Sequence, residues 1–281
     1  MSTILAIAKT TYGEAMRKKV LNAFLLVAVG IILISLSFSS FGFQQDITIV
    51  KSFGLGILAL AAILISVILG ISLIPNEVER RTIYMILSKP VRRYEFILGK
   101  FLGAAATLFV NIALMGVVFI AAATIKAAFA TVTTGISGGG ISESVSIRPQ
   151  AFDPGLIVGV GMVYFQALLL LGVTVFFSIF LTPTVNFFMS GAVFMIGSFS
   201  ATLGSLVSGE RLAGPLKIIY KVLHWIMPNF GYYNIQNQII HPDIQIRSMP
   251  VYITEVVVYA LMYSLVLILI GIFIFDKKEF E

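Results

Sequence analysis

Cysteine and charge are what this sequence has least of. None of its 281 residues is cysteine, which excludes disulfides, thiolate nucleophiles and cysteine-based metal sites. Only 11% of the residues are Asp, Glu, Lys or Arg, whereas soluble domains average about 25%. A chain that is 58% hydrophobic and so poor in charge is predicted to be an all-α membrane protein that crosses the bilayer several times.

Six apolar runs are long enough to cross the hydrocarbon core, which takes roughly 20 residues. They lie at about 20–41, 53–74, 96–125, 156–181, 185–207 and 252–275. This layout predicts a single transmembrane domain over residues 1–281, with external loops at 126–155 and 208–251. A basic amphipathic stretch at 3–19 precedes the first run, and we expect it to form an interfacial helix on the membrane surface.

The apolar runs have no groups for chemistry at their centres. No Asp, Glu, Lys, Arg or His falls in the middle of any run. Ion-coupled transporters and proton pumps usually keep such a group there, so its absence argues against both classes and against an intramembrane metalloprotease. His224 and His241 are the only histidines and form a weak basis for a metal site. The glycine cluster at 138–140 has no following Gly-Lys-Ser/Thr, so it is not a phosphate-binding loop. We therefore expect no enzyme activity, metal or cofactor in this chain.

Positive charge gathers between the second and third runs, at residues 76–95. Asn76 is a suitable N-cap with Glu77 and Glu79 in the first turn, and Pro90 ends the short helix that they begin. Basic loops between spans stay on the cytoplasmic side, which places this segment and both termini there. The net charge of +6 is therefore explained by the membrane and its anionic lipids, and we expect no nucleic-acid partner.

The order of residues in this stretch resembles the pattern Glu-x-x-Thr, Leu, Pro, Arg and Gly-Lys found between the second and third spans of ABC-2 type transporter permeases. The residues that carry the likeness are Glu79, Thr82, Leu87, Pro90, Arg93, Gly99 and Lys100. The likeness is greatest to the branch associated with multicopper-enzyme maturation, which includes the permease of the nitrous-oxide reductase maturation system. Relatives often have Gly before the Thr, whereas this chain has Arg81, so the local docking contacts are expected to differ.

The resemblance implies a coupling helix at 76–95 that docks on a separate cytoplasmic ABC ATPase. The docking residues implied are Glu77, Glu79, Arg80, Arg81, Thr82, Leu87, Pro90 and Arg93. The resemblance also implies that the partner binds ATP and Mg, that two permease copies pair as a homodimer, and that the complex is an exporter in the cell (inner) membrane. An alternative of a different class is a membrane scaffold that supports assembly or maturation of a periplasmic protein and transports nothing.

Small and polar residues recur every four positions at the start of the third run, at Gly99, Gly103, Thr107 and Asn111. This spacing puts them close to one face of a helix. Small residues let helices approach closely in a membrane, where packing drives association. The stripe is therefore predicted to be a helix-packing face, either within the chain, which we favour, or between two copies.

Overall fold

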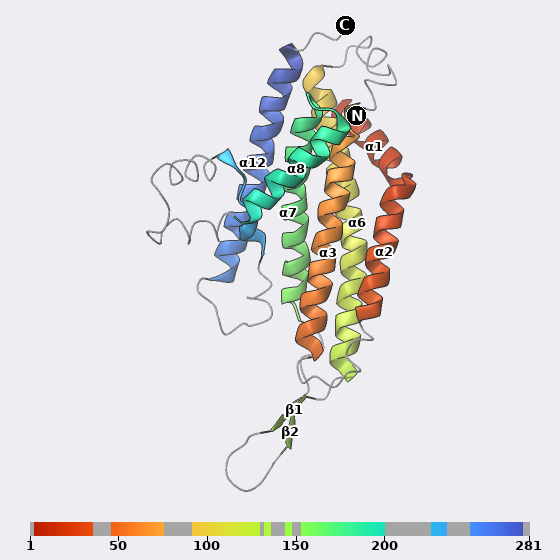
Figure 1. Ribbon diagram of the computed structural model, residues 1–281, viewed down its shortest axis with the longest axis vertical. Coiled ribbons are helices and arrows are strands. Elements are labelled where there is room, and N and C mark those ends of the chain that lie inside the picture. The colour runs from red at the N-terminus through yellow and green to blue at the C-terminus, as the bar shows by residue number, and fades with distance from the viewer. Residues whose placement is uncertain are drawn as a thin grey trace.

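The computed structural model describes residues 3–35, 46–75, 92–129, 132–135, 144–147, 153–199, 226–234 and 248–277. In these ranges the chain is a helical bundle with one short antiparallel hairpin (Figure 1). The α-helices are α1 (Thr3–Met16), α2 (Lys19–Ser35), α3 (Asp46–Ile71), α6 (Arg93–Phe129), α7 (Gly155–Ser178), α8 (Pro183–Ser198) and α12 (Met249–Lys277). A 3-10 helix, η2, covers Phe230–Tyr233, and the hairpin strands are β1 (Val132–Gly135) and β2 (Ser144–Ile147).

The bundle has two distinct ends. Helices α3, α7 and α12 run toward one end of the bundle and α2 and α6 run away from it, so that α1, the start of α6 and the last turn of α12 gather at that end, which we call the α1 end (Figure 1). The hairpin projects beyond the opposite end, which we call the hairpin end, with Val132 paired to Ile147. The N-terminal helix and the end of the C-terminal helix therefore lie on the same side of the bundle.

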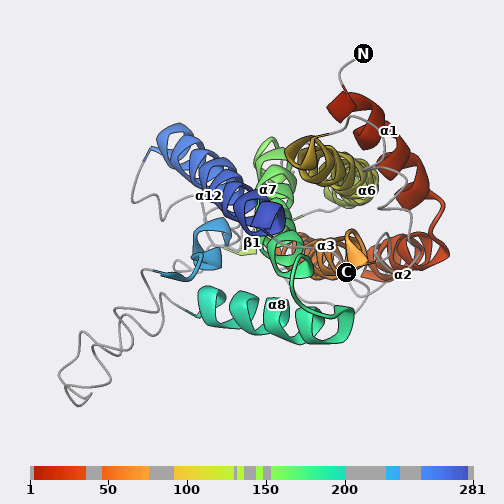
Figure 2. The same ribbon diagram turned by 90° about the horizontal axis from the view of Figure 1, so that it is seen from above.

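Helix α7 is the central element. It packs against α3, α6, α8 and α12, as the view along the bundle shows (Figure 2). Its sequence is apolar on every side, which is the pattern of a helix surrounded by others, and most of its residues are buried. Helix α12 instead leaves large apolar side chains exposed along its length, including Leu261, Leu265 and Leu269. Such a surface suits contact with lipid tails.

Small residues set the separations between these helices. A Cβ atom at Gly70 of α3 would lie 2.6 Å from the Cβ of Thr174 on α7. A Cβ at Gly116 of α6 would lie 2.6 Å from Cγ1 of Val160, also on α7. Neither distance leaves room for a side chain, so α3 and α6 approach α7 through glycine, as is common between membrane helices.

Four of the six predicted spans are confirmed as helices long and apolar enough to cross a membrane. They are Val50–Ile71, Arg93–Ala127, Gly155–Ser178 and Met249–Lys277. Helices α2 and α8 have 17 and 16 residues, fewer than a perpendicular crossing requires, and α8 crosses the bundle obliquely (Figures 1 and 2). The rest of their predicted runs, at 36–41 and 200–207, lies outside the described residues, so the six-span count stays a prediction.

Several boundaries differ from the sequence prediction; for example, α3 begins at Asp46 and not at about 53. Helix α6 extends to Phe129, and the strands β1 and β2 lie within the stretch 126–155 that is predicted to be an external loop. The strands VTTG and SVSI are rich in β-branched and small residues, which favour extended pairing.

Candidate functional site

At the α1 end, the start of α6 is tied to the last turn of α12. The Glu95 carboxylate accepts a hydrogen bond from the Arg92 N–H at 3.1 Å, which is half of a capping box. The next residue, Arg93, donates from its guanidinium to the carbonyl oxygens of Phe275 at 3.1 Å and Asp276 at 2.9 Å. Carbonyls in a last helical turn lack intrahelical donors and form the negative end of the helix dipole. Arg93 therefore stabilises the C-terminus of α12 and joins it to α6.

Helix α1 lies along the first turns of α6, and two glycines of the predicted stripe form the contact. A Cβ at Gly103 would lie 2.6 Å from the carbonyl oxygen of Ala8, and one at Gly99 would lie 2.8 Å from the Cβ of Ile7. Helix α6 contributes no side chain at these positions, so the backbone and side chains of α1 lie directly against it.

The other two residues of the stripe are buried and bonded within their own helix. The Thr107 hydroxyl donates to the carbonyl of Gly103 at 2.9 Å, and the Asn111 amide donates to the carbonyl of Thr107 at 2.8 Å. Asn111 also reaches the sulfur of Met16 at the end of α1, at 3.9 Å. The structure thus places the stripe against α1 of the same chain.

Two lysines that the sequence places among the surface charges are held within this junction. Lys100 is only 7% exposed, and its Nζ lies 5.9 Å from the centre of the Phe96 ring. Lys18 donates to the hydroxyl of Ser72, the residue that follows α3, at 2.8 Å. Together with Glu14 they line a cavity of about 20 Å³ between α1, α3 and α6, which is the size of one water molecule. Helix α1 is therefore fixed to the bundle by polar as well as close apolar contacts.

A groove of about 630 Å³ lies between α3, α7, α8 and η2; we call it the α3–α8 groove. Its described lining comes from α3 between Leu55 and Leu64, from α7 between Gly159 and Gln166, from α8 between Phe194 and Phe199, and from Phe230 to Asn234. The groove thus follows the middle of α3 and the hairpin-end half of α7.

The chemistry of the groove is apolar with a few uncharged polar groups. Among its described lining residues there is no Asp, Glu, Lys, Arg or His. The polar side chains are Gln166, Ser198, Tyr233 and Asn234. The hydroxyl oxygen of Ser198 is buried and has no hydrogen-bond partner within the described parts of the chain.

One wall of the groove is a short segment, residues 226–234, that α12 holds by a set of tyrosine hydrogen bonds; we call this set the tyrosine clamp. The hydroxyls of Tyr263 and Tyr252 donate to the carbonyls of Ile226 and Tyr232, each at 2.6 Å, and the Asn229 N–H donates to the phenol oxygen of Tyr259 at 3.0 Å. From the segment side, Tyr233 donates to the carbonyl of Val256 at 3.4 Å. Since η2 is too short to satisfy its own backbone, these bonds supply partners that a helix or sheet would otherwise provide.

The clamped segment is wedged against α8. Phe230 is fully buried, and its ring lies 5.1 Å from the ring of Phe194. A Cβ at Gly197 would collide with the Pro228 carbonyl and lie 2.7 Å from the Phe230 ring, so only glycine fits there. Burial raises the pKa of Tyr233 above its ordinary value, so its hydroxyl remains a hydrogen-bond donor in alkaline as well as neutral solution.

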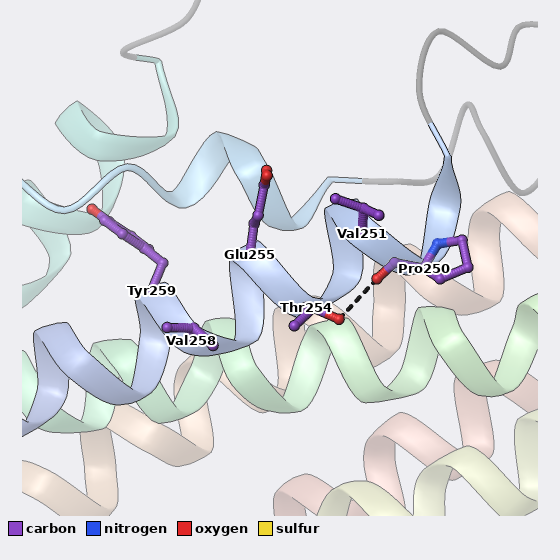
Figure 3. A pocket seen from close by; sticks show the side chains of 6 residues that line it. All are labelled: Pro250, Val251, Thr254, Glu255, Val258 and Tyr259. Atoms are coloured by element: carbon purple, nitrogen blue, oxygen red, sulfur yellow. Dashed lines mark hydrogen bonds between the residues drawn. The ribbon is translucent and has the colours of Figure 1, made fainter.

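A second hollow, shown in Figure 3, lies on the first turns of α12. Its described lining residues are Pro250, Val251, Thr254, Glu255, Val258 and Tyr259. The Thr254 hydroxyl donates to the Pro250 carbonyl at 2.9 Å within the helix, and Glu255 and Tyr259 project from the same side of α12. Because one helix supplies all of these residues, the hollow is less enclosed by the bundle than the α3–α8 groove.

A buried polar joint fixes the start of α8 to the end of α7. The Asn186 amide donates to the Thr174 carbonyl at 3.0 Å, and the Ser190 hydroxyl donates to the Asn186 side-chain oxygen at 2.9 Å. All three residues are fully buried. Pro183 at the first helical position and Thr182 before it turn the chain sharply enough to bring Asn186 back onto α7.

At the hairpin end, an ion pair joins α3 to the start of α7. Lys51 Nζ lies 2.6 Å from the Asp153 carboxylate, whose other oxygen accepts from the Gly155 N–H at 2.9 Å. Both side chains are mostly buried, at 20% and 28% exposure. Asp153 thus caps α7 and anchors α3 with one side chain.

Of the predicted ATPase-docking residues, Arg93 alone lies in the described part of the chain. Glu77, Glu79, Arg80, Arg81, Thr82, Leu87 and Pro90 lie outside it, as do His224 and His241. Within the described ranges, no three His, Asp or Glu side chains come close enough to hold a metal ion. The groove and the tyrosine clamp were missed by sequence reasoning, although Tyr252, Tyr259 and Tyr263 recur at helical spacing.

Comparison with known proteins identifies the family of this chain. Residues 3–280 match the family described as ABC-2 family transporter protein. No curated protein matches the sequence. The family match covers nearly the whole chain and agrees with the long apolar helices described above. The chain therefore belongs to the ABC-2 transporter family, as a multi-pass membrane protein and a permease of an ABC transporter.

Proposed function

We propose that this chain is the membrane-spanning subunit of an ABC exporter, driven by a separate cytoplasmic ATPase that binds ATP and Mg. The observation that carries the proposal is the family match along residues 3–280, because ABC-2 permeases generally work with such an ATPase. The sequence has no phosphate-binding loop of its own, so ATP hydrolysis would occur on the partner.

The geometry of the α1 end supports a mechanical role for this end of the bundle, which would pass movement from the ATPase to the helices. Residues 72–92 connect the end of α3 to the start of α6. Helix α1 and the last turn of α12 both contact that start of α6. A push on that connection would reach α6 directly, α12 through Arg93 and α1 through Gly99 and Gly103. In this proposal the α1 end faces the cytoplasm of the cell, both termini lie there, and the hairpin end faces outward.

Two further parts of the proposal follow from the resemblance. The permease would act as a homodimer, with a second copy completing the transport pathway, and the exposed apolar faces of α2, α8 and α12 would contact lipid or that copy. The order of Glu79, Thr82 and Pro90 supports the branch concerned with multicopper-enzyme maturation. An adjacent reading frame for an ABC ATPase, together with one for a periplasmic copper-site protein, would support that branch.

Pairing with the ATPase tests the docking role. We expect the ATPase to copurify with the full-length chain and to be lost with Glu79→Arg, which reverses a charge in the proposed coupling helix. Glu281→Arg makes the same change outside that helix and should leave pairing intact. Unchanged pairing in Glu79→Arg would overturn the docking assignment. An ABC ATPase that never copurifies with the unaltered chain would favour the scaffold alternative.

A further inference from the structure

We propose that the α3–α8 groove binds uncharged amphipathic molecules of small-molecule size. This inference rests on the proposed function in one respect only, namely that the bound molecules would be the cargo of the permease. Binding itself depends only on the size, chemistry and walls of the groove.

The size of the groove suits a discrete small molecule. Its volume of about 630 Å³ lies inside the range of roughly 300–1,000 Å³ that holds drug-sized ligands. Four separate elements supply its lining, so a ligand would be surrounded by the protein on several sides.

The lining selects against charge. A charged ligand would lose hydration and find no Asp, Glu, Lys, Arg or His among the described lining residues to compensate it. The rings of Phe194 and Phe199 offer apolar surface, while Gln166 and Asn234 offer uncharged donors and acceptors. The buried hydroxyl of Ser198 adds a polar atom beside the groove that lacks a partner among the described residues. This combination fits an apolar body with one or two uncharged polar groups.

The groove also has one wall that other helices position. Phe230, Tyr233 and Asn234 belong to the segment that the tyrosine clamp fastens to α12, and Phe230 rests on Gly197 of α8. The shape of the groove therefore depends on how α12 and α8 stand relative to α3. Movement of α12, transmitted from Arg93 at the α1 end, would widen or narrow the groove and so alter binding.

Two glycines provide a matched pair of variants for testing the site. A Cβ atom at Gly56 or at Gly30 has nothing within 4 Å in the described structure, so a larger side chain can be added at either. Gly56 lines the groove, whereas Gly30 lies on α2 away from it. Gly56→Trp should fill the groove and Gly30→Trp should not. Equal thermal unfolding of the two variants checks that both fold.

The probe is a benzophenone amphiphile with a terminal hydroxyl, used with the full-length chain in lipid nanodiscs beside its quaternary ammonium and sulfonate counterparts. We expect saturable photolabelling of peptides that contain residues 55–64 and 194–199. Gly56→Trp should reduce this labelling about tenfold or more, Gly30→Trp should leave it unchanged, and the charged probes should label about tenfold less.

Three results would overturn the proposal. The first is labelling spread evenly over the lipid-exposed face of α12, which would mean that the probe samples only bulk lipid. The second is equal labelling of Gly56→Trp and the unaltered chain. The third is equal labelling by the charged and the uncharged probes. If any of these occurs while the ATPase still copurifies, the groove assignment fails and the permease assignment stands. Specific labelling in a chain that pairs with no ATPase would support the binding site and overturn the proposed function.

Discussion

Single glycines decide how closely α1 can approach α6. Replacing Gly103 by Leu would push its side chain into the Ala8 carbonyl and Thr11, so α1 must shift or detach. Overpacking of this kind costs about 1–3 kcal/mol. We expect Gly103→Leu to lower the thermal unfolding midpoint of the detergent-solubilised protein, while Gly30→Leu, which has open space, leaves it nearly unchanged. Equal midpoints would mean that α1 does not pack on α6.

Asn186 is the residue on which the α7–α8 joint depends. Asn186→Leu removes the amide that donates to Thr174 and leaves the buried Ser190 hydroxyl without its acceptor. Polar contacts between membrane helices are worth about 0.6–2 kcal/mol, so the variant should unfold at lower denaturant concentration. Ser190→Ala should lower the free energy of unfolding by less than Asn186→Leu does. Adding Ser190→Ala to Asn186→Leu should lower it by less than Ser190→Ala alone, because both changes break one shared contact. Additive losses in this double-mutant cycle would contradict the joint.

At the scale of elements, the tyrosine clamp determines whether residues 226–234 keep their place beside α8. Tyr259→Phe removes the phenol oxygen that accepts from the Asn229 N–H. An unpaired buried donor costs about 1–3 kcal/mol, which corresponds to a roughly fivefold to hundredfold faster amide exchange. Hydrogen exchange measured by mass spectrometry should show this at residues 229–232. Tyr94→Phe, an exposed tyrosine on α6, is the control and should change nothing there.

The contact between α6 and α12 makes a second element-scale prediction. Arg93→Gln removes the charged donor from the Phe275 and Asp276 carbonyls, so the last turn of α12 should exchange its amide hydrogens faster. The neighbouring Arg92 is exposed and contributes its backbone N–H to the Glu95 cap, so Arg92→Gln serves as the matched control. Similar exchange in both variants would show that Arg93 does not hold the end of α12.

At the scale of the whole molecule, the long helices could be predicted and their lateral arrangement could not. Runs such as Gly155–Ser178 are apolar for the full width of a bilayer, where a helix satisfies every backbone group internally. Lys100, by contrast, lies near one end of an apolar run, where a lysine side chain usually extends to water. It is buried because α1 packs over it, and the sequence does not show where α1 docks.

The candidate site also could not be predicted from local sequence patterns. The spacing of Tyr252, Tyr259 and Tyr263 puts them near one face of a helix, but it does not reveal that their partners are backbone atoms of residues 226–234. The α3–α8 groove likewise arises from the oblique path of α8, which is set by Asn186 and the turn at Pro183. Both features depend on contacts between segments that are distant in the sequence.

The orientation of the molecule is the claim on which the proposed function most depends, because a cytoplasmic motor can act only on the inner face. The cysteine-free chain permits a direct measurement with Ser88→Cys, between α3 and α6, and Thr134→Cys, in β1. A membrane-impermeant maleimide is added to intact cells and then to permeabilised cells. If the α1 end faces the cytoplasm, Thr134→Cys reacts in intact cells and Ser88→Cys reacts only after permeabilisation. Reaction of Ser88→Cys in intact cells would contradict this orientation.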